Sequence, residues 1–259
     1  MSDALPRLHG RVAVVTGSTR RTGKAIAMRL AAAGACVVIN GRNDPVRADA
    51  VVKEIETQHG RGRAAASIAD ITKPEQARVL IATAVGHFGG LDILVNNAAI
   101  RLSTELESIT FDEWRLVLDT CLDGAFLCSQ AAAPYLGRSG HGRIINIGGT
   151  AGHFGGRAHA HVVTAKAGLV GLTKALAHDL GPRGITVNCL APGIMEDATD
   201  DPALVAHRRG GRTPDMLLAQ RFGRVEDVVA SVINLCGPAW DYLTGQTIHL
   251  NGGLFLGGA

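Results

Sequence analysis

The sequence predicts an α/β protein built on a single doubly wound parallel sheet with helices on both faces, a three-layer α-β-α arrangement. Short β-branched runs alternate with helical patterns along most of the 259 residues, and this alternation is typical of repeated βαβ units. The runs Ile93-Leu94-Val95 and Ile144-Ile145 are continuously apolar, as in strands that helices cover on both sides. No linker-like stretch interrupts the pattern, so we expect one domain over residues 1–259.

The expected elements follow in order from the first strand. Residues 11–16 form a β-branched run that ends in a glycine-containing turn, and residues 23–34 form an alanine-rich helical pattern that glycine closes. The same alternation predicts strands at residues 35–40, 63–68, 91–95, 143–148, 185–190 and 246–250, and helices at residues 45–59, 74–88, 111–136, 158–180 and 225–235. Regularity stops between Leu190 and about Pro214, and we expect a substrate lid at about residues 193–214.

Composition and charge favour a cytoplasmic protein that acts on small molecules. The formal net charge of +3 is spread along the chain, which argues against nucleic acid as a partner. Residues 1–10 hold no long apolar run and 18 consecutive apolar residues occur nowhere, so we expect neither secretion nor a membrane partner. The five cysteines are scattered without a Cys-x-x-Cys spacing, which predicts free thiols in a reducing compartment. We expect no metal site.

A glycine-containing turn, Thr16-Gly-Ser-Thr-Arg-Arg-Thr-Gly23, joins the first strand to the first helix. Backbone N–H groups and the positive end of a helix in this position can hold a pyrophosphate. Taken alone, the glycines also fit a tight turn with no ligand. Motifs further along the chain decide between these interpretations.

Four further motifs stand in order after later strands: Asp70-Ile71, Asn96-Asn97-Ala98-Ala99, Pro192-Gly193-Ile194 and Asn251-Gly252-Gly253. With the turn at residues 16–23, they resemble the short-chain dehydrogenase/reductase family over nearly the whole chain. The resemblance implies a Rossmann-type fold, oxidoreductase activity and a nicotinamide cofactor.

The resemblance further implies a preference for NADP(H). Family members that bind NAD end the second strand with an acidic residue, whereas this strand ends Asn40-Gly41-Arg42. Arg20 and Arg42 are placed as in NADP-preferring relatives, so a 2′-phosphate would meet two cations; solvated arginines are the alternative. The implied cofactor contacts are Gly17, Thr19, Arg20, Arg21, Thr22, Gly23, Asn40, Arg42, Asp70, Ile71, Asn97, Ala98, Ala99, Lys166, Pro192, Gly193 and Ile194.

Arg21 departs from the family's usual turn, Thr-Gly-x-x-x-Gly-x-Gly, because it stands where the middle glycine would be. In this it resembles the pteridine reductase branch, whose turn reads Thr-Gly-x-x-x-Arg-x-Gly. The resemblance implies that Arg21 reaches cofactor phosphate directly.

The catalytic residues that the family uses are mostly replaced. In relatives, a tyrosine supplies the proton, a lysine four residues later lowers its pKa and holds the ribose, a serine orients the substrate and an asparagine anchors a water. Lys166 matches the lysine, but Val162, Gly149 and Cys121 stand at the tyrosine, serine and asparagine positions. Because valine and glycine carry no proton to donate, the family mechanism does not transfer unchanged.

Two interpretations remain open. The first is an NADPH-dependent hydride transfer to a small carbonyl, imine or activated alkene, in which another group handles the proton; His159, His153 and Thr150 are candidates beside Lys166, and His161 ranks lower. An apolar gap where the tyrosine would stand then enlarges the pocket above the nicotinamide. The second is an inactive NADP(H)-binding relative that acts as a sensor, a partner subunit or a non-redox catalyst.

The resemblance also bears on assembly and on the lid. Family members commonly form tetramers that pair the two long helices, here residues 111–136 and 158–180, so we expect a homotetramer or at least a dimer. Glu196 or Asp197 falls near the place of a family threonine that touches the nicotinamide. Arg208, Arg209 and Arg212 are candidates for an anionic substrate group, with a solvated loop face as the alternative.

Overall fold

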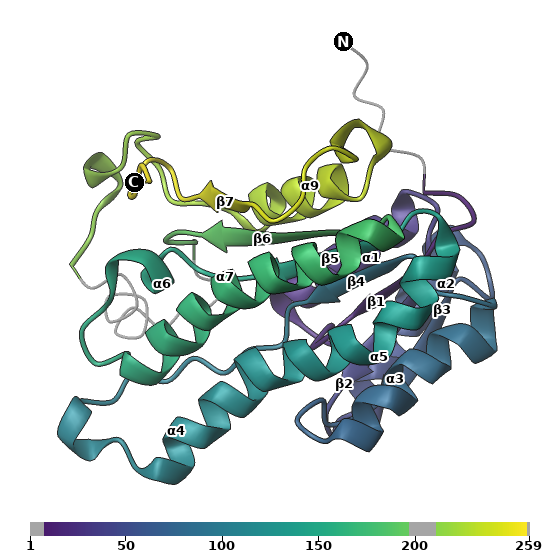
Figure 1. Cartoon of the computed structure of the whole chain (residues 1–259), viewed down its shortest axis with the longest axis horizontal. Coiled ribbons are helices and arrows are strands. Elements are labelled where there is room, and N and C mark those ends of the chain that lie inside the picture. Colours follow the sequence, from purple (N-terminus) through teal and green to yellow (C-terminus); the bar gives the residue numbers. More distant parts are fainter. Residues whose placement is uncertain (1–7, 197–210, 258–259) are drawn as a thin grey trace.

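The computed structural model describes residues 8–196 and 211–257 and contains a seven-stranded sheet in the order β3-β2-β1-β4-β5-β6-β7 (Figure 1). Every neighbouring pair of strands is parallel. The strands are β1 (Val12–Val15), β2 (Cys36–Gly41), β3 (Ala64–Ile68), β4 (Ile93–Asn96), β5 (Arg143–Ile147), β6 (Thr186–Pro192) and β7 (Thr247–Leu250). The predicted doubly wound α/β fold is confirmed.

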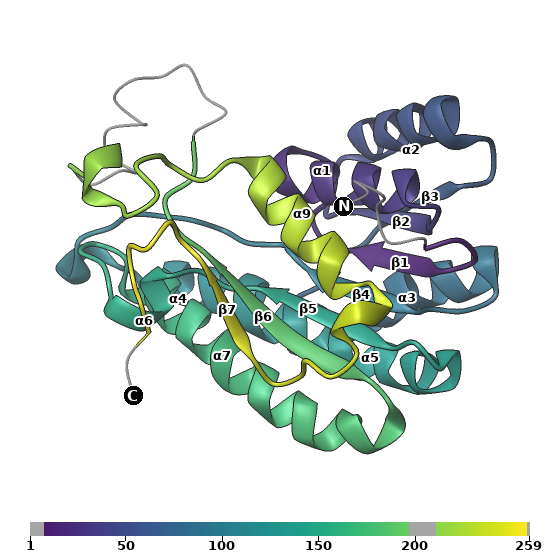
Figure 2. The same ribbon diagram turned by 90° about the horizontal axis from the view of Figure 1, so that it is seen from above.

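Helices cover both faces of this sheet, as Figures 1 and 2 show. The first helix layer holds α1 (Arg21–Ala32), α2 (Pro45–His59) and α9 (Val225–Leu235); the second holds α3 (Pro74–Phe88), α4 (Phe111–Leu118), α5 (Gly124–Ser139), α6 (Ala151–Phe154) and α7 (Ala160–Leu180). Each layer encloses its own apolar core against the strands, one centred on Ile26, Ile39 and Val232 and the other on Leu80, Leu94 and Leu136. Burial of these faces is the main source of stability.

Two helix predictions were wrong in detail. The single helix expected at residues 111–136 is interrupted by a π-helical turn at Asp119–Asp123, where Arg115 pairs with both flanking carboxylates. The helix expected from residue 158 begins at Ala160, because Ala158 has a φ of 57° and His159 is not helical. A π turn is a single-turn bulge inside an α-helix, so the helical patterns on both sides of it run on without a loop signal between them.

The continuous helical stretch Phe111–Ser139 is long and apolar enough to cross a membrane by composition alone. In this fold its apolar side chains Cys128, Ala132 and Leu136 are buried against the sheet. Core helices of globular domains pass the same test, so the stretch is accounted for by the packing of the second layer.

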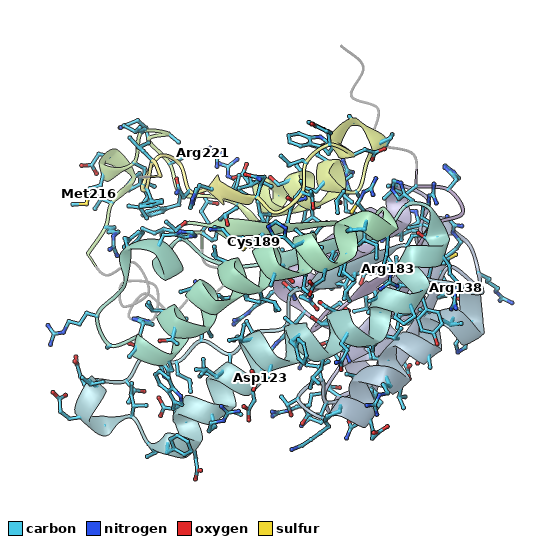
Figure 3. All side chains as sticks on the ribbon, in the orientation of Figure 1. Asp123, Arg138, Arg183, Cys189, Met216 and Arg221 are labelled. Carbon is cyan, nitrogen blue, oxygen red and sulfur yellow. The ribbon has the colours of Figure 1, made fainter. Side chains whose placement is uncertain are left out.

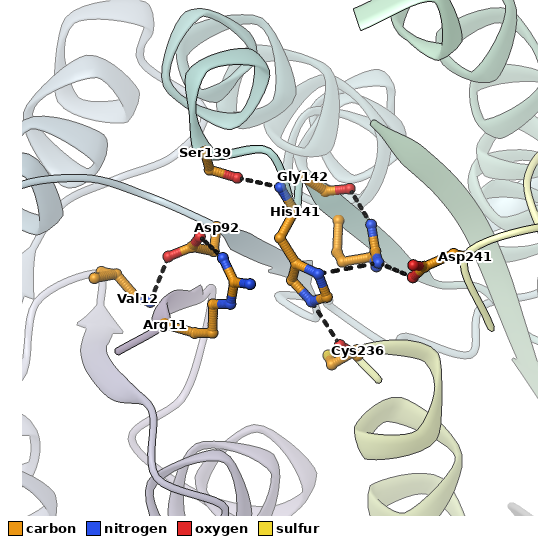
Figure 4. A network of polar contacts seen from close by, with 9 residues as sticks. Arg11, Val12, Asp92, Ser139, His141, Gly142, Cys236 and Asp241 are labelled. Carbon is orange, nitrogen blue, oxygen red and sulfur yellow. Dashed lines mark hydrogen bonds and ion pairs between the residues drawn. The ribbon is translucent and has the colours of Figure 1, made fainter. Parts of the chain in front are cut away.

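A network of charged and polar side chains ties the chain together at the amino-terminal edge of the sheet (Figure 4). Arg143, at the start of β5, is only 3% exposed and bonds to Asp241, to the Gly142 carbonyl and to Nδ1 of His141. His141 Nε2 contacts the Cys236 carbonyl at 2.8 Å, and Arg11 pairs with Asp92 at 3.1 Å. These contacts join β1, β4, β5 and the end of α9 at the amino-terminal ends of the strands.

The same network makes stability depend on pH through His141. Burial lowers the pKa of His141, and the Arg143 guanidinium acts in the same direction. The folded-state pKa of His141 therefore lies below its unfolded value of about 6.5. The contribution of the neutral imidazole to folding stability is fully present above the unfolded pKa and is lost as pH falls through the folded pKa. We expect the free energy of unfolding in urea to decrease between pH 7 and pH 5, and less steeply in His141→Gln than in His178→Gln, an exposed control on α7. Identical pH slopes in the two variants would contradict the assignment.

Candidate active site

A crevice at the carboxyl ends of β1 and β4 forms the centre of the candidate site. These two strands are neighbours in the sheet, but their connections run in opposite directions, to α1 and β2 on one side and to α4 and β5 on the other. Ligands of doubly wound sheets bind at such a switch point. The turn after β1 and the segment after β4 therefore face one another across the predicted cofactor site.

Close backbone approach across this crevice explains the glycines of the turn. Gly17 has a φ of 61°, and a Cβ placed on it would lie 3.0 Å from Cα of Ala98. A Cβ on Gly23 would collide with the Gly17 carbonyl and lie 2.5 Å from Nδ2 of Asn97. Asn97 in turn donates to the carbonyls of Thr16 and Gly17, at 2.9 and 3.2 Å. The structure thus brings together four of the predicted contacts, Gly17, Gly23, Asn97 and Ala98.

Asn40 is used within the protein rather than presented to a ligand. Its side chain accepts from the Gly17 backbone N–H at 3.1 Å and donates to the carbonyls of Ser67 and Ala69. The residue is 2% exposed. With its amide and its oxygen both occupied, this side chain fixes the turn to the ends of β2 and β3, and a cofactor contact by Asn40 stays a prediction.

The amino-terminal end of α1 is positively charged and open. Helix α1 has Arg20 as its N-cap with no side-chain cap, and no acidic residue occupies its first turn. Arg20, Arg21 and Arg42 are exposed, and none of them makes an ion pair within the described ranges. Three cations thus stand beside uncapped helix N–H groups, an arrangement that favours an anion. Thr19 and Thr22 are partly buried in the same turn.

Arg21 has a backbone conformation that non-glycine residues rarely adopt. Its φ is 48°, within the left-handed region. This is the position at which the family's turn has glycine, so the chain keeps the backbone shape of that turn while adding a guanidinium.

Of the two residues in the Asp70-Ile71 motif after β3, Asp70 is partly exposed and Ile71 is buried. Asp70 accepts from the Thr72 backbone N–H and hydroxyl at 3.0 and 2.8 Å, which leaves its second carboxylate oxygen for a ligand. Ile71 is 6% exposed and packs against Gly124, where an added Cβ would lie 2.7 Å from Ile71 Cδ1. Ile71 therefore offers its backbone rather than its side chain. Ala99, after β4, is exposed.

The motif after β6 is held by the carboxyl-terminal turn. A Cβ on Gly193 would lie 2.7 Å from Cα of Asn251, so the Asn-Gly-Gly segment packs directly on Pro192 to Ile194. The expected lid begins here, but residues 197–210 lie outside the described chain, and with them Asp197, Arg208 and Arg209. Met216 and Arg221, on the segment that follows, lie at the same end of the molecule as α6 (Figure 3).

Lys166 is buried in the centre of the site. It is 7% exposed, and its Nζ donates to the Ile147 carbonyl at 2.6 Å. Burial lowers the pKa of Lys166; the thiols of Cys121 and Cys189 act in the opposite direction, and Arg101 acts with burial. Cys189, on β6, lies near the middle of the molecule in Figure 3. The amine therefore stands in a poorly solvated place at the carboxyl end of β5.

Val162 and Cys121, which the resemblance aligns with the family's tyrosine and asparagine, belong to an apolar cluster. Val162 and Cys121 are buried together with Val117 and Ala165, and Ile100 and Leu102 pack against them. Val162 is only 6% exposed, because neighbouring apolar groups cover it. Its side chain therefore does not border the open gap that is expected from the sequence. Cys121 Sγ exchanges weak hydrogen bonds with the backbone of Ile100.

The three alternative proton donors differ in what occupies them: the Thr150 hydroxyl is engaged by backbone carbonyls, His159 uses only its Nδ1, and Nε2 of His153 is buried without a hydrogen-bond partner among the described residues. Thr150 is 2% exposed and its hydroxyl contacts the carbonyl of Pro192 at 3.0 Å. His159 precedes α7, and its Nδ1 contacts the Arg157 carbonyl at 2.5 Å, so it does not share the helical face of Val162 and Lys166. His153 packs against His249 and Phe255, with ring centroids 4.4 and 5.4 Å away.

His161 forms a contact that sequence patterns did not predict. It is completely buried; its Nδ1 accepts from the Val162 N–H, and its Nε2 contacts Glu113 on α4 at 2.9 Å. Thr104 and His161 together lower the pKa of Glu113. A partner 48 residues away on another helix gives no local sequence signal. The contact fixes the start of α7, and hence Val162, against α4.

The strand order and the glycine-shaped crevice at the switch point define a Rossmann-type α/β fold of the oxidoreductase class. A family model described as Enoyl-(Acyl carrier protein) reductase matches residues 17–255. The 3-oxoacyl-(acyl-carrier-protein) reductase FabG of Staphylococcus aureus is 40% identical over 246 residues, which cover 94% of this chain and 98% of the relative. The chain belongs to the short-chain dehydrogenase/reductase family.

Solved structures of this fold agree closely with the chain. A blue fluorescent protein from a metagenomic library, solved with NADPH, has a TM-score of 0.85 at 34% identity and covers 96% of this chain and 99% of its own. A gluconate 5-dehydrogenase from Burkholderia cenocepacia, solved with NADP and tartrate, has a TM-score of 0.86 at 33% identity and covers 96% of both chains.

Proposed function

We propose that the protein is an NADPH-dependent oxidoreductase that transfers hydride to a small carbonyl, imine or activated alkene without a tyrosine acid. The observation that carries the proposal is the contrast within one site. The cofactor crevice keeps its glycines, its cations and Lys166, while Val162, Gly149 and Cys121 offer no hydroxyl group to the substrate.

The residues present fit NADP(H). Gly17 and Gly23 leave room that a Cβ would fill, and α1 begins without an acidic residue or a side-chain cap. Arg20 and Arg42 would hold the 2′-phosphate, Arg21 another phosphate, and Lys166 the nicotinamide ribose. The relative solved with NADPH supports this choice. When bound, the reduced nicotinamide supplies the hydride; the protein's part is to position the substrate and to manage the proton.

Loss of the usual acid favours substrates that need little protonation. General acid–base catalysis contributes about 10²–10⁴-fold, whereas correct positioning contributes more. A polarised alkene, an imine or an activated carbonyl accepts hydride with little such help. Ile100 and Leu102, which are partly exposed and pack over buried Val162, offer an apolar surface that suits the uncharged part of such a substrate.

The test is a panel of ketones, imines and enones with NADPH, followed by loss of absorbance at the nicotinamide band. We expect turnover of at least one activated class and little turnover of simple ketones. Tight NADPH binding with no oxidation across the panel would replace this proposal with the second interpretation, a cofactor-binding relative that performs no hydride transfer.

Substitution of Arg21 separates its backbone effect from its charge. Because a non-glycine residue in the left-handed region costs about 1–2 kcal/mol, Arg21→Gly should raise the free energy of unfolding of the cofactor-free protein by about 1 kcal/mol and weaken NADP⁺ binding. Arg21→Ala keeps the strain and loses the charge, so it should weaken binding without the gain in stability. Calorimetry with and without NADP⁺ measures both; unchanged affinity in both variants would remove Arg21 from the site.

We also propose a homotetramer that pairs α4, α5 and α7 across a two-fold axis. Phe111, Leu116 and Phe126 are exposed on the outer side of α4 and α5, and exposed Ala167, Gly171 and Ala175 recur at four-residue spacing on α7. Light scattering at micromolar concentration should give four times the chain mass of 27.0 kDa, and Ala175→Glu should reduce it. A monomer in the native protein would contradict the proposal.

A further inference from the structure

Lys166 places an amine where the neighbouring positions 162 and 149 carry no hydroxyl group. We propose, on the basis of the proposed hydride transfer, that the ammonium group of Lys166 is itself the proton donor of this site. For a carbonyl substrate, its carbon gains the hydride, its oxygen takes a proton from Nζ, and the products are the alcohol, oxidised cofactor and a neutral amine. Water then returns the proton to the amine.

The stem of Lys166 borders the space from which the family's serine would act. A Cβ placed on Gly149 would lie 3.7 Å from Cγ and 3.9 Å from Cδ of Lys166, and no other heavy atom beyond the adjacent residues is within 4 Å. Glycine therefore leaves free volume directly beside the lysine chain.

The ammonium group of Lys166 has N–H donors beyond the one that it uses. In the described chain, Nζ makes one hydrogen bond, to the Ile147 carbonyl, whereas an ammonium has three donors. Two N–H groups thus remain for a ribose hydroxyl and for the substrate atom that becomes negative. The Thr150 hydroxyl and the Cys121 thiol are engaged by backbone groups. His159 lies before α7, and the ring of His153 packs against His249 and Phe255.

The surroundings make this ammonium a better acid than an exposed lysine. Burial lowers the pKa of Lys166 and the Arg101 guanidinium lowers it further, while the thiols of Cys121 and Cys189 oppose the shift. No carboxylate within the described ranges pairs with Lys166. A lower pKa brings the donor closer to neutral pH, where general acids are most effective.

A direct titration tests the acidity without turnover. The chain contains five lysines, Lys24, Lys53, Lys73, Lys166 and Lys174, so protein labelled with ¹³C at the lysine ε-carbon gives a spectrum that Lys→Arg variants can assign. In cofactor-free protein the Lys166 signal should titrate at a lower pH than the ordinary value for a lysine. A midpoint at the ordinary value would overturn the proposal.

Kinetics test the donor role itself, with a substrate that the panel shows to be reduced. The kcat of the native enzyme should fall about tenfold per pH unit above the Lys166 midpoint. Lys166→Arg keeps a cation but does not release a proton in this range, so its lower kcat should lack that limb. A limb that survives in Lys166→Arg, or is absent from the native enzyme, would overturn the donor role alone. Absence of hydride transfer from every substrate would overturn the proposed function, and the donor role with it.

Discussion

The variant that combines Val162→Tyr with Gly149→Ser is expected to reduce simple ketones with NADPH about 10²–10⁴ times faster than the native chain. The tyrosine would stand one helical turn before Lys166, whose ammonium group favours the phenolate, and the serine would orient the substrate oxygen. Neither substitution alone should have a comparable effect, because each leaves the other hydroxyl missing. Initial rates of NADPH oxidation measure the gain.

The matched control is Val162→Phe with Gly149→Ala, which adds similar volume without either hydroxyl. Val162 lies in a buried apolar cluster, and enlarging such a residue costs about 1–3 kcal/mol, so both double variants should lose similar thermal stability. Only the hydroxyl-bearing pair should gain ketone reductase activity. Equal activity in the two double variants would show that volume, rather than proton transfer, limits the native site.

Removal of Arg20 and Arg42 together is expected to lower the preference for NADP⁺ over NAD⁺ by at least about 10²-fold. Each charge-assisted hydrogen bond to the 2′-phosphate contributes about 1.5–3 kcal/mol, and NAD⁺ lacks that phosphate. The variant Arg20→Ala/Arg42→Ala should therefore lose affinity for NADP⁺ and keep most of its affinity for NAD⁺. Equilibrium titration with each cofactor gives the ratio.

Arg29→Ala with Arg61→Ala removes the same charge from exposed positions away from the end of β2. This control separates local recognition from the general attraction of a cationic protein for an anion. Its cofactor preference should match that of the native chain. Tighter binding of NADH than of NADPH by the native chain would contradict the assignment of Arg20 and Arg42 to the 2′-phosphate.

The sequence was sufficient for most of the architecture because periodicity reports burial directly. Helices at Pro45–His59, Pro74–Phe88 and Val225–Leu235 have the predicted bounds, since each begins or ends at proline, glycine or a turn. The crevice was also predictable, because Gly17, Gly23 and Asn97 carry out their roles through close backbone approach. Short elements such as α6 were missed because four residues carry no measurable period.

The hydrogen-bond partners of the side chains in the site could not be predicted, because those partners are distant in sequence. The fourfold hydrogen bonding of Asn40 draws on β3 and on the turn after β1, and the His161–Glu113 contact joins α7 to α4. Counting back along the helix expected from residue 158 puts His159 on the face of Val162 and Lys166, but Ala158 has a positive φ and the helix begins only at Ala160. Spacing along the chain identifies the candidate site residues. Tertiary contacts determine which of their polar atoms are free to meet a ligand.

The polar network around Arg143 lies at the opposite edge of the sheet from every residue argued to meet cofactor or substrate. The polar side chains that tie the sheet together at this end are therefore separate from Lys166 on α7 and from the turns proposed to hold the cofactor. A lineage with this arrangement can exchange reacting groups one at a time while every intermediate still folds.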